Sequence, residues 1–259
     1  MISFIGAGRM AESLISRLGA PQNIIVSDIS KKRLAYLKKK YRVKVAGNNL
    51  EAFQAGSVIV LAVKPQNMAD VLAEVAGQKL VISIAAGIPL SYLQKKLPRC
   101  KLIRAMPNNP CLAGHGMTAL TKGKGVTRRE LRIASKIFGS VGEVAEVPEK
   151  WMDAVTGLSG SGPAFIYLVM EAMMKAGESL GIEPKVAERL SIQTVLGSAR
   201  TMLETGKSAR ELRAMVASPG GTTIEGLKVL EKGRFFHDLM GAVRAAAKKS
   251  KVLSKKWTS

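Results

Sequence analysis

The chain has 259 residues, of which 47% are hydrophobic, so it can form one large globular domain or two of ordinary size. It carries 40 lysines and arginines against 19 aspartates and glutamates, but aromatic residues make up only 5%. The net charge of +21 attracts anions. Because the basic residues are dispersed and aromatic stacking platforms are scarce, nucleic acid is not expected as a partner. The charge is interpreted either as a solvated, soluble surface or as a field that steers an anionic cofactor and substrate, and the sequence does not decide between the two.

Several further classes are excluded by what the chain lacks. It has no stretch of about 20 apolar residues, so no membrane span is expected. An apolar run begins at Ile2 and leaves no room for a signal or transit peptide. Cys100, Cys111, His115 and His237 lack the spacing of metal ligands. We therefore expect no metal, two free thiols and a cytoplasmic location.

The first element is an apolar strand over residues 2–5 that breaks into a glycine-containing turn and a helix. Gly6, Gly8 and Ala11 stand in the G-x-G-x-x-G/A order that binds dinucleotides. Gly6 permits the tight turn, Gly8 admits a pyrophosphate, and Ala11 lets the helix pack on the strand. Asp28 ends a second apolar run about 20 positions after Gly8, the distance expected for a ribose contact. A glycine turn without a ligand is the alternative, and this spacing disfavours it.

The segments after Asp28 alternate between strand and helix. A helix capped by Ser30 is expected over residues 30–40, another opens at Asn48 and Asn49, and a third covers 128–138. Strands are expected at 43–45, 57–63, 79–84, 102–106, 117–120 and 143–147. This alternation predicts an α/β fold with a doubly wound sheet, and we place this dinucleotide-binding domain at residues 1–150.

Ligands of open α/β sheets bind at the carboxyl ends of the strands, so the residues that follow strands are of interest. Lys64 follows the most apolar strand and is either a cofactor contact or a surface lysine. The small residues at 85–87 would let a flat ring, such as nicotinamide, approach the backbone. Residues 107–110 place two amides between two prolines and form a rigid loop at the same edge.

From Trp151 onward no convincing strand is present, and we expect a helical domain over residues 151–259. The helix at 164–180 is apolar on almost every face, and a domain of this size has little interior to bury it. We infer that it packs against another subunit, with Glu171 a structural carboxylate in preference to a catalytic acid. Further helices are expected at 184–205, after a capping box at Ser208 and Glu211, and at 234–253.

A second ligand site is expected at residues 217–225. Gly220 and Gly221 can turn successive N–H groups inward, directly before a helix N-terminus. Thr222 and Glu225 have capping-box spacing, which starts the helix at about Thr223. Hydroxyl groups of Ser218, Thr222 and Thr223 surround the turn, so the segment suits a small carboxylate substrate. An ordinary N-cap after a proline-glycine turn is the alternative.

The chain resembles the pyrroline-5-carboxylate reductases over essentially its whole length. The motifs that carry the resemblance are IGAGRM (5–10), AVKPQ (62–66), IAAG (84–87), RAMPN (104–108), GMTA (116–119), GLSGSGPAF (157–165) and SPGGTTI (218–224). The resemblance implies a Rossmann domain followed by a helical substrate-binding and dimerisation domain, with the active site at the dimer interface. It also implies reduction of 1-pyrroline-5-carboxylate to L-proline, the last step of proline biosynthesis, by hydride transfer from NAD(P)H.

The resemblance also implies roles for individual residues. Ser218 and the backbone N–H groups of Gly220, Gly221 and Thr222 would hold the substrate carboxylate. Thr223 would contact the ring nitrogen as the catalytic hydroxyl. The residues carried over to the cofactor side are Gly6, Gly8, Met10, Asn49, Ala62, Lys64, Ala86 and Gly87.

The sequence departs from the family pattern at Asn109 and His115, where we expect no change in chemistry, and at Asp28. A carboxylate at Asp28 favours the ribose hydroxyls of NADH and repels the 2′-phosphate of NADPH. The basic residues at 31–33 could compensate, so the expectation favours NADH and keeps NADPH open.

Two rival functions are kept. The nearest is a reductase of the same architecture that acts on another cyclic imine or a short carbonyl acid. The other is a nucleotide-sensing or nucleic-acid-binding protein that retains the fold without the chemistry, and the glycines and hydroxyls of both ligand sites speak against it.

Overall fold

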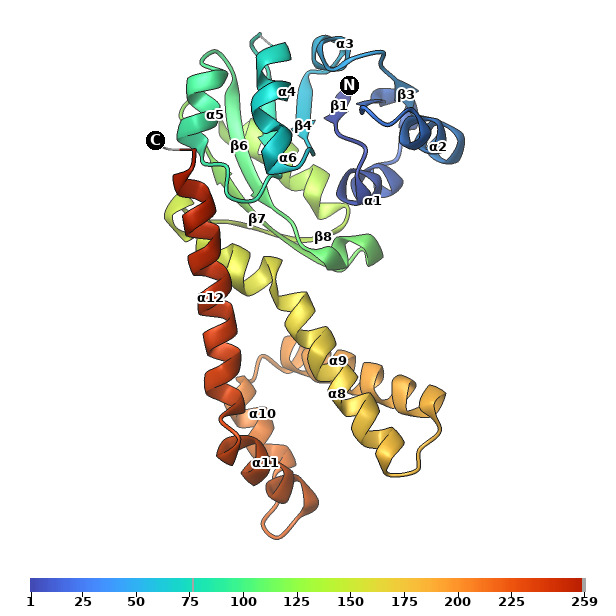
Figure 1. Cartoon of the computed structure of the whole chain (residues 1–259), viewed down its shortest axis with the longest axis vertical. Coiled ribbons are helices and arrows are strands. Elements are labelled where there is room, and N and C mark those ends of the chain that lie inside the picture. Colours follow the sequence, from blue (N-terminus) through green and yellow to red (C-terminus); the bar gives the residue numbers. More distant parts are fainter. Residues whose placement is uncertain (76, 258–259) are drawn as a thin grey trace. The chain divides into compact units, whose positions relative to one another are not determined.

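The computed structural model describes residues 1–75 and 77–257 (Figure 1). The chain divides into two compact units, one of residues 1–161 with the chain from 243 onward and one of residues 162–242. These bounds differ from the expected 1–150 and 151–259. Contacts explain the difference, because Ser250 and Ser254 donate hydrogen bonds to Asp153 and a Cβ on Gly157 would meet Val243 and Ala247. The end of the chain therefore packs on the first unit.

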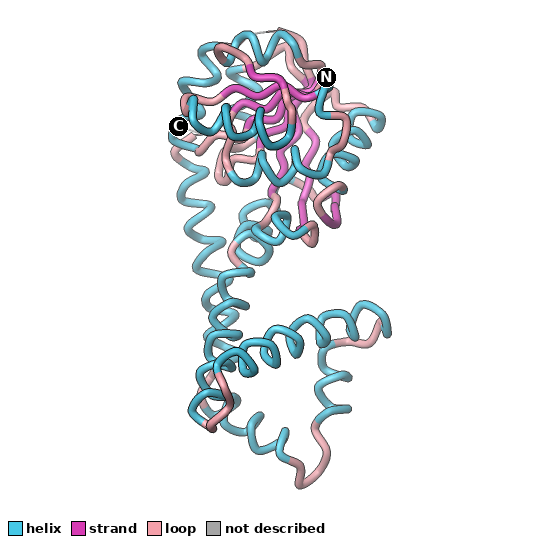
Figure 2. Tube along the Cα trace, turned by 90° about the vertical axis from the view of Figure 1, so that its right-hand side faces the viewer, coloured by secondary structure: helices cyan, strands magenta, loops and turns pink. Residues whose placement is uncertain are grey.

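The first unit contains one eight-stranded sheet (Figure 2). Its strands are β1 (Ile2–Ile5), β2 (Ile24–Ser27), β3 (Lys44–Val45), β4 (Val58–Leu61), β5 (Leu80–Ser83), β6 (Lys101–Met106), β7 (Gly116–Lys122) and β8 (Gly142–Glu146), in the order β3-β2-β1-β4-β5-β6-β7-β8. The pairings are parallel except that β7 runs antiparallel to β6. Ile5 pairs with Ser27 and with Leu61, so the carboxyl ends of the neighbouring strands β2, β1 and β4 are level. The strand order reverses at β1, which confirms the expected doubly wound sheet.

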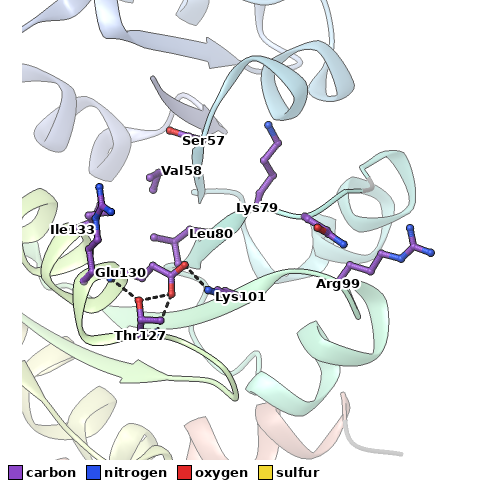
Figure 3. Close-up of a pocket in the computed structure, with 11 residues that line it drawn as sticks. Ser57, Val58, Lys79, Leu80, Arg99, Lys101, Thr127, Glu130 and Ile133 are labelled. Atoms are coloured by element: carbon purple, nitrogen blue, oxygen red, sulfur yellow. Dashed lines mark hydrogen bonds and ion pairs between the residues drawn. The ribbon is translucent and has the colours of Figure 1, made fainter.

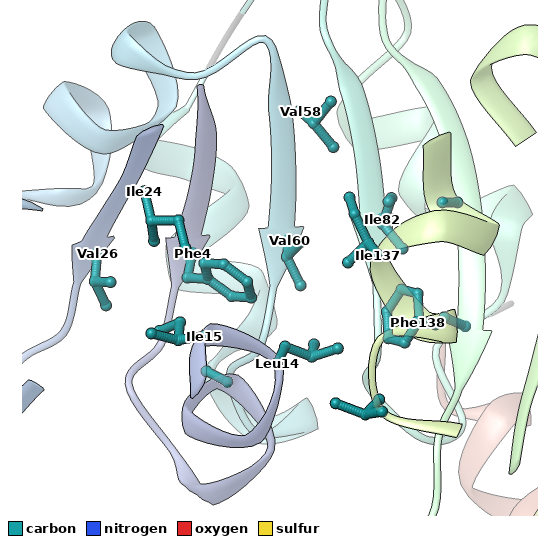
Figure 4. Packing of buried hydrophobic residues seen from close by; sticks show 14 of the residues in the cluster. Phe4, Leu14, Ile15, Ile24, Val26, Val58, Val60, Ile82, Ile137 and Phe138 are labelled. Carbon is teal, nitrogen blue, oxygen red and sulfur yellow. The ribbon is translucent and has the colours of Figure 1, made fainter. Parts of the chain in front are cut away.

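Helices cover both faces of this sheet because the strands are apolar on both sides. They are α1 (Arg9–Arg17), α2 (Lys31–Tyr41), α3 (Asn49–Ala55), α4 (Met68–Glu74), α5 (Leu90–Lys96) and α6 (Arg128–Gly139). Alternate strand residues point to opposite faces, so Phe4 lies in one buried cluster and Ile5 in the other. The first cluster joins the sheet to α1 and α6 (Figure 4). It also joins the sheet to α2, while the second cluster joins it to α3, α4 and α5.

The sequence signals for helix starts are confirmed in this unit. Ser30 and Asn48 cap α2 and α3 by accepting the N–H groups of Arg33 and Glu51. The remaining short elements of the unit are 3₁₀ turns at Pro21–Asn23, Pro65–Asn67, Asn109–Ala113 and Glu149–Trp151, helix α7 (Met152–Val155) and a π-helical turn at Thr156–Gly160.

The second unit contains helices and loops (Figure 2). Its helices are α8 (Gly162–Ser179), α9 (Pro184–Thr205), α10 (Ala209–Val216), α11 (Thr222–Lys232) and the first turns of α12 (Phe235–Lys255). Gly206 ends α9 in a left-handed conformation, and Ser208 and Glu211 form the expected capping box of α10.

The second unit has almost no interior of its own. Within residues 162–242, all of which the structure describes, only Ala187 and Ser191 are buried. Helix α8 packs along α9 yet leaves Ile166, Tyr167 and Leu168 exposed. The apolar surface of α8 is therefore not accounted for within its own unit, as its all-round apolar sequence predicts.

Candidate functional site

The glycine turn after β1 lies at the point where the strand order of the sheet reverses. Gly6 has φ +102°, a conformation that favours glycine. A Cβ at this position would lie 2.7 Å from the carbonyl carbon and oxygen of Ala62, which follows β4. Gly6 therefore permits both the turn and the close approach of β1 and β4, where doubly wound sheets bind their ligands.

Gly8 differs from Gly6 because it faces open space. It is the N-cap residue of α1 with φ −69°, so its backbone is accessible to any residue type. A Cβ at Gly8 would have no heavy atom of the described residues within 4 Å. Glycine has no side chain that could cap the helix, so no side chain at Gly8 accepts the first N–H groups of α1. The N-terminus of α1 therefore faces the open space. The donors and the space both fit a pyrophosphate.

Asp28, directly after β2, is held against the glycine turn. Its Oδ2 accepts the N–H of Ala7 at 2.6 Å, and its Oδ1 accepts the N–H of Ser30 at 2.8 Å. The carboxylate thus lies beside the turn, where the dinucleotide fingerprint requires it. Its contact with a ribose stays a prediction.

The other residues expected on the cofactor side follow neighbouring strands. Asn49 accepts the hydroxyl of Ser27 at 2.8 Å and donates to Glu74 at 2.6 Å, which holds its amide at the end of β2. Ala62 donates its N–H to Ile5, and Lys64 is exposed after β4. Met10 is half-buried and packs against the first core cluster.

The segment after β5 has a structural constraint that the sequence did not reveal. Gly87 is buried with φ +75°, and a Cβ there would lie 3.3 Å from Cβ of Leu253 in α12. Glycine at this position therefore lets the end of α12 pack onto the segment. Ala86 is half-buried one residue earlier.

A buried arginine holds the same segment from another side. Arg104 on β6 is only 5% exposed, and its Nη1 lies 3.5 Å from Oε1 of Glu149. That oxygen accepts the N–H of Leu90 at the start of α5, at 2.7 Å. Burial lowers the pKa of Arg104, and the charges of Glu149 and Asp153 oppose this change. The chain from Gly87 to Leu90 is thus anchored at both ends.

The proline-bracketed loop after β6 also makes specific contacts. Asn108 accepts the N–H of Met117 at 2.8 Å and donates to the carbonyl and hydroxyl oxygens of Ser159, both at 3.2 Å. The amide therefore joins the loop to the glycine-serine turn before α8. Sequence reasoning identified the rigid loop but not the residue that it contacts.

Sequence reasoning missed a polar cluster between α1 and α2. Glu12 accepts hydrogen bonds from Arg33, Tyr36, Tyr41 and Lys40, at distances from 2.8 to 3.3 Å. Burial opposes ionisation of Glu12, but these four donors outweigh it and lower its pKa to about 2. The signal for this cluster in the sequence is the group of basic residues at 31–33, which sequence reasoning interprets as possible contacts of a 2′-phosphate.

The expected substrate turn belongs to the second unit, whereas the expected cofactor residues belong to the first. Gly220 has φ +72°, and the N–H of Gly221 donates to the carbonyl of Ser218 at 3.0 Å. The expected capping box is wrong. Gly221 is the N-cap residue of α11 and Thr222 is its first helical residue, while Glu225 pairs with Lys228. A glycine cap leaves the first-turn N–H groups available to an anion. The half-buried Thr223 is in this first turn.

A separate cavity of about 720 Å³ lies at the amino ends of β4, β5 and β6 (Figure 3). Its basic wall includes Lys79, Arg99 and Lys101, and Lys101 is paired with Glu130 at 2.9 Å. This edge is opposite to the carboxyl ends where the glycine turn lies, so we do not assign the cavity to the cofactor.

Among residues 1–75 and 77–257, no group of three or more His, Cys, Asp and Glu side chains is arranged to hold a metal ion. In the same part of the chain, no helix is long and apolar enough to cross a membrane.

The glycine turn at the reversal point of a doubly wound sheet is typical of a dinucleotide-binding protein. In agreement, residues 1–87 match the family described as NADP oxidoreductase, coenzyme F420-dependent. Residues 149–253 match the family described as pyrroline-5-carboxylate reductase dimerisation.

Full-length relatives make the assignment specific. The chain is 46% identical to a pyrroline-5-carboxylate reductase of Synechocystis sp., with 98% of each chain covered. It superimposes on the structure of such a reductase from Coxiella burnetii with a TM-score of 0.88, at 39% identity and 98% coverage of both chains. A Plasmodium falciparum pyrroline carboxylate reductase with NADP bound gives a TM-score of 0.87 at 32% identity, with 98% and 97% coverage. The chain belongs to the pyrroline-5-carboxylate reductase family.

Proposed function

We propose that this protein reduces the C=N bond of 1-pyrroline-5-carboxylate with NAD(P)H and so forms L-proline. The observation that carries the proposal is the open helix N-terminus at Gly8 on the reversal point of the sheet, in a chain that matches the reductase family over its whole length. The glycine-capped start of α11 provides a second anion site for the substrate carboxylate.

The proposed reaction needs little covalent work from the protein. When bound, a nicotinamide would supply a hydride to the imine carbon, and the ring nitrogen would gain a proton. Gly6, Gly8 and the first turn of α1 hold the pyrophosphate. Asp28 and Asn49 would contact the adenosine part of the cofactor, and the residues that would contact the rest are Met10, Ala62, Lys64, Ala86 and Gly87. Positioning of the two rings then provides much of the rate enhancement.

On the substrate side, Ser218 and the N–H groups of Gly220, Gly221 and Thr222 hold the carboxylate. The hydroxyl of Thr223 hydrogen-bonds to the ring nitrogen and favours its protonated form. Because the cofactor and substrate residues belong to different compact units, we propose that the active site is completed on self-association through the helical unit.

We propose NADH as the preferred cofactor. The carboxylate of Asp28 repels a 2′-phosphate, and the next residue, Ile29, is apolar and 92% exposed. Arg33, which could offer a compensating charge, is bonded to Glu12 and to the carbonyl of Ala7. The P. falciparum relative has NADP bound, so the preference needs a direct test. We expect Asp28→Ser to raise kcat/KM for NADPH relative to NADH, and an unchanged ratio would show that Asp28 is not the selector.

The primary test is to follow oxidation of NADH and of NADPH by absorbance, with purified protein and with or without pyrroline-5-carboxylate. Turnover that depends on this substrate supports the proposal, and the two rates give the cofactor preference. If a cofactor binds but pyrroline-5-carboxylate is not reduced, the substrate assignment fails. A panel of other cyclic imines and short carbonyl acids then identifies the related reductase activity.

Thr223→Ala tests the catalytic hydroxyl. Loss of one aimed hydrogen bond should lower kcat by about tenfold or more while the Kd for NADH stays unchanged. Thr194→Ala is the matched control, because it removes an exposed hydroxyl of α9 that bonds only to the carbonyl of its own helix at Leu190. Equal kcat values for Thr223→Ala and the unmodified enzyme would remove Thr223 from the mechanism.

We also propose a cytosolic location. Its support is that Cys100 and Cys111 are both free and buried, as expected for a protein of a reducing compartment.

A further inference from the structure

Both backbone polar groups of Ala7, the residue between the two glycines, are held by side chains. Its N–H donates to Oδ2 of Asp28 at 2.6 Å, and its carbonyl accepts Nε–H of Arg33 at 2.9 Å. Asp28 follows β2, and Arg33 lies in the first turn of α2. Two side chains that are distant from Ala7 in the sequence therefore hold this one loop residue. Ala7 is itself buried.

These contacts orient the loop because peptide groups are planar and trans. In a trans peptide the C=O and the following N–H point in opposite directions. Arg33 holds the carbonyl of the Ala7–Gly8 peptide, so the N–H of Gly8 must point away from Arg33. Rotation of this peptide would break the bond to Arg33. The direction of a backbone donor in the cofactor loop is therefore coupled to the Arg33 side chain.

Arg33 is held in turn by α1. Its Nη2 donates to Oε2 of Glu12 at 2.8 Å, while Oε1 of Glu12 accepts Tyr36 and Tyr41. Glu12 is thus saturated with donors and tied to α2 at several points. The planar guanidinium donates one hydrogen bond to Ala7 and another, in a different direction, to Glu12. A lysine ammonium on its flexible stem cannot reproduce this fixed pair of donors.

We propose that Glu12 and Arg33 are positioning residues that hold the Ala7–Gly8 peptide in the orientation that binds the cofactor pyrophosphate. This inference rests on the proposed function, since it assumes that the glycine turn binds a dinucleotide. In this proposal Arg33 acts on the binding of the pyrophosphate, which NADH and NADPH have in common. The proposal therefore excludes Arg33 as a receptor for the 2′-phosphate, the role that its basic neighbourhood in the sequence suggests.

The test is to titrate NADH and NADPH separately into the full-length enzyme, the Arg33→Lys variant and the Glu12→Gln variant, and to measure each Kd. Arg33→Lys retains the charge but loses the two-directional donor set. We expect it to raise the Kd of both cofactors by the same factor, about tenfold for one lost charge-assisted hydrogen bond. Glu12→Gln should raise both in parallel by a smaller factor. KM for pyrroline-5-carboxylate should stay unchanged.

Lys39→Gln is the control for charge, because Lys39 is an exposed cation of the same helix. It should leave both Kd values unchanged, whereas Arg33→Gln should raise both at least as much as Arg33→Lys. If Arg33→Lys does not fold, Glu12→Gln keeps the inference testable, since it leaves the arginine in place and weakens its anchor together with the bonds from Tyr36, Tyr41 and Lys40.

Three results would overturn the inference. A selective loss of NADPH affinity would make Arg33 a 2′-phosphate contact. A lower melting temperature with unchanged Kd for both cofactors would make the pair merely structural. An equal loss of cofactor affinity in Lys39→Gln and in Arg33→Gln would show that overall charge, and not the position of Arg33, causes the effect. If the unmodified enzyme binds neither cofactor, the proposed function itself fails, and this outcome is distinct from the other three.

Discussion

At the scale of single residues, the two glycines of the cofactor turn have opposite requirements. Gly6 is in a left-handed conformation with Ala62 in its path, whereas Gly8 has an ordinary φ and open space in front of it. Gly6→Ala should lower the free energy of unfolding by about 2–4 kcal/mol, since strain and overpacking combine. Gly8→Ala should change it by less than about 0.5 kcal/mol and yet weaken NADH binding. Urea unfolding and cofactor titration of both variants check this contrast, and equal stabilities would contradict it.

The ionisation of Glu12 makes the stability of the folded protein depend on pH in the acidic range. The pKa of Glu12 is lowered from 4.5 to about 2 in the folded protein, so the folded state binds the proton less readily than the unfolded state. The stabilisation is therefore fully present above the unfolded pKa and is lost as the pH falls toward the folded value. Glu12→Gln should be less stable than the unmodified protein at about pH 6, and the gap should narrow as the pH falls below 4.5. Urea unfolding at several pH values measures it, and a constant gap would refute the argument.

At the scale of elements, the segment between β5 and α5 depends on a buried ion pair. Arg104 is 5% exposed and its partner Glu149 is 37% exposed. Glu149→Gln removes the paired counter-charge of the buried guanidinium and leaves only the charge of Asp153 near it. It should lower the free energy of unfolding by about 1–3 kcal/mol, less than for a fully buried pair. Glu146→Gln is the control, because its pair with Lys122 is half-exposed and should contribute under about 1 kcal/mol. A similar loss in both variants, by urea unfolding, would show that burial of Arg104 is not the cause.

At the scale of the whole molecule, the helical unit needs a partner. With only Ala187 and Ser191 buried in residues 162–242, which the structure describes throughout, this unit cannot reach the burial of a stable domain by itself. Its large exposed apolar residues are Ile166, Tyr167, Leu168, Leu180, Ile182, Val186, Leu190, Ile192, Leu196, Met202, Leu203, Met215, Val216, Val229, Leu230, Phe235, Phe236 and Met240. An apolar surface of this extent is typical of an interface between subunits.

We expect a dimer or larger assembly in light scattering, and Leu168→Glu should dissociate it. Leu168 is 66% exposed on α8, and a carboxylate there would be desolvated in an apolar interface. The variant should lose reductase activity and still bind NADH, because the cofactor residues belong to the other unit. Ile29→Glu, at an exposed apolar residue of the first unit, should not change the oligomeric state. An active monomer would refute the proposal that assembly completes the active site.

Local sequence signals predicted much of this molecule because they act over a few residues. The alternating strands and helices, the caps at Ser30 and Asn48 and the capping box at Ser208 all depend on neighbours along the chain. The expected capping box at Thr222 is wrong, because Gly221 takes the cap position and the helix starts one residue earlier than expected. The Asp28 spacing placed its carboxylate correctly beside the glycine turn.

Sequence patterns alone predicted a doubly wound sheet, the location of both glycine turns and the family, because periodicity, glycine positions and motif spacing are properties of short segments. Three features follow from tertiary packing only. Arg33 donates hydrogen bonds to Ala7 and Glu12, the absence of a side chain at Gly87 lets Leu253 pack there, and the second half of α12 belongs to the first unit. These are contacts between residues 21 or more positions apart, and their partners are selected only when helices and strands pack together. Sequence spacing carries no record of that packing.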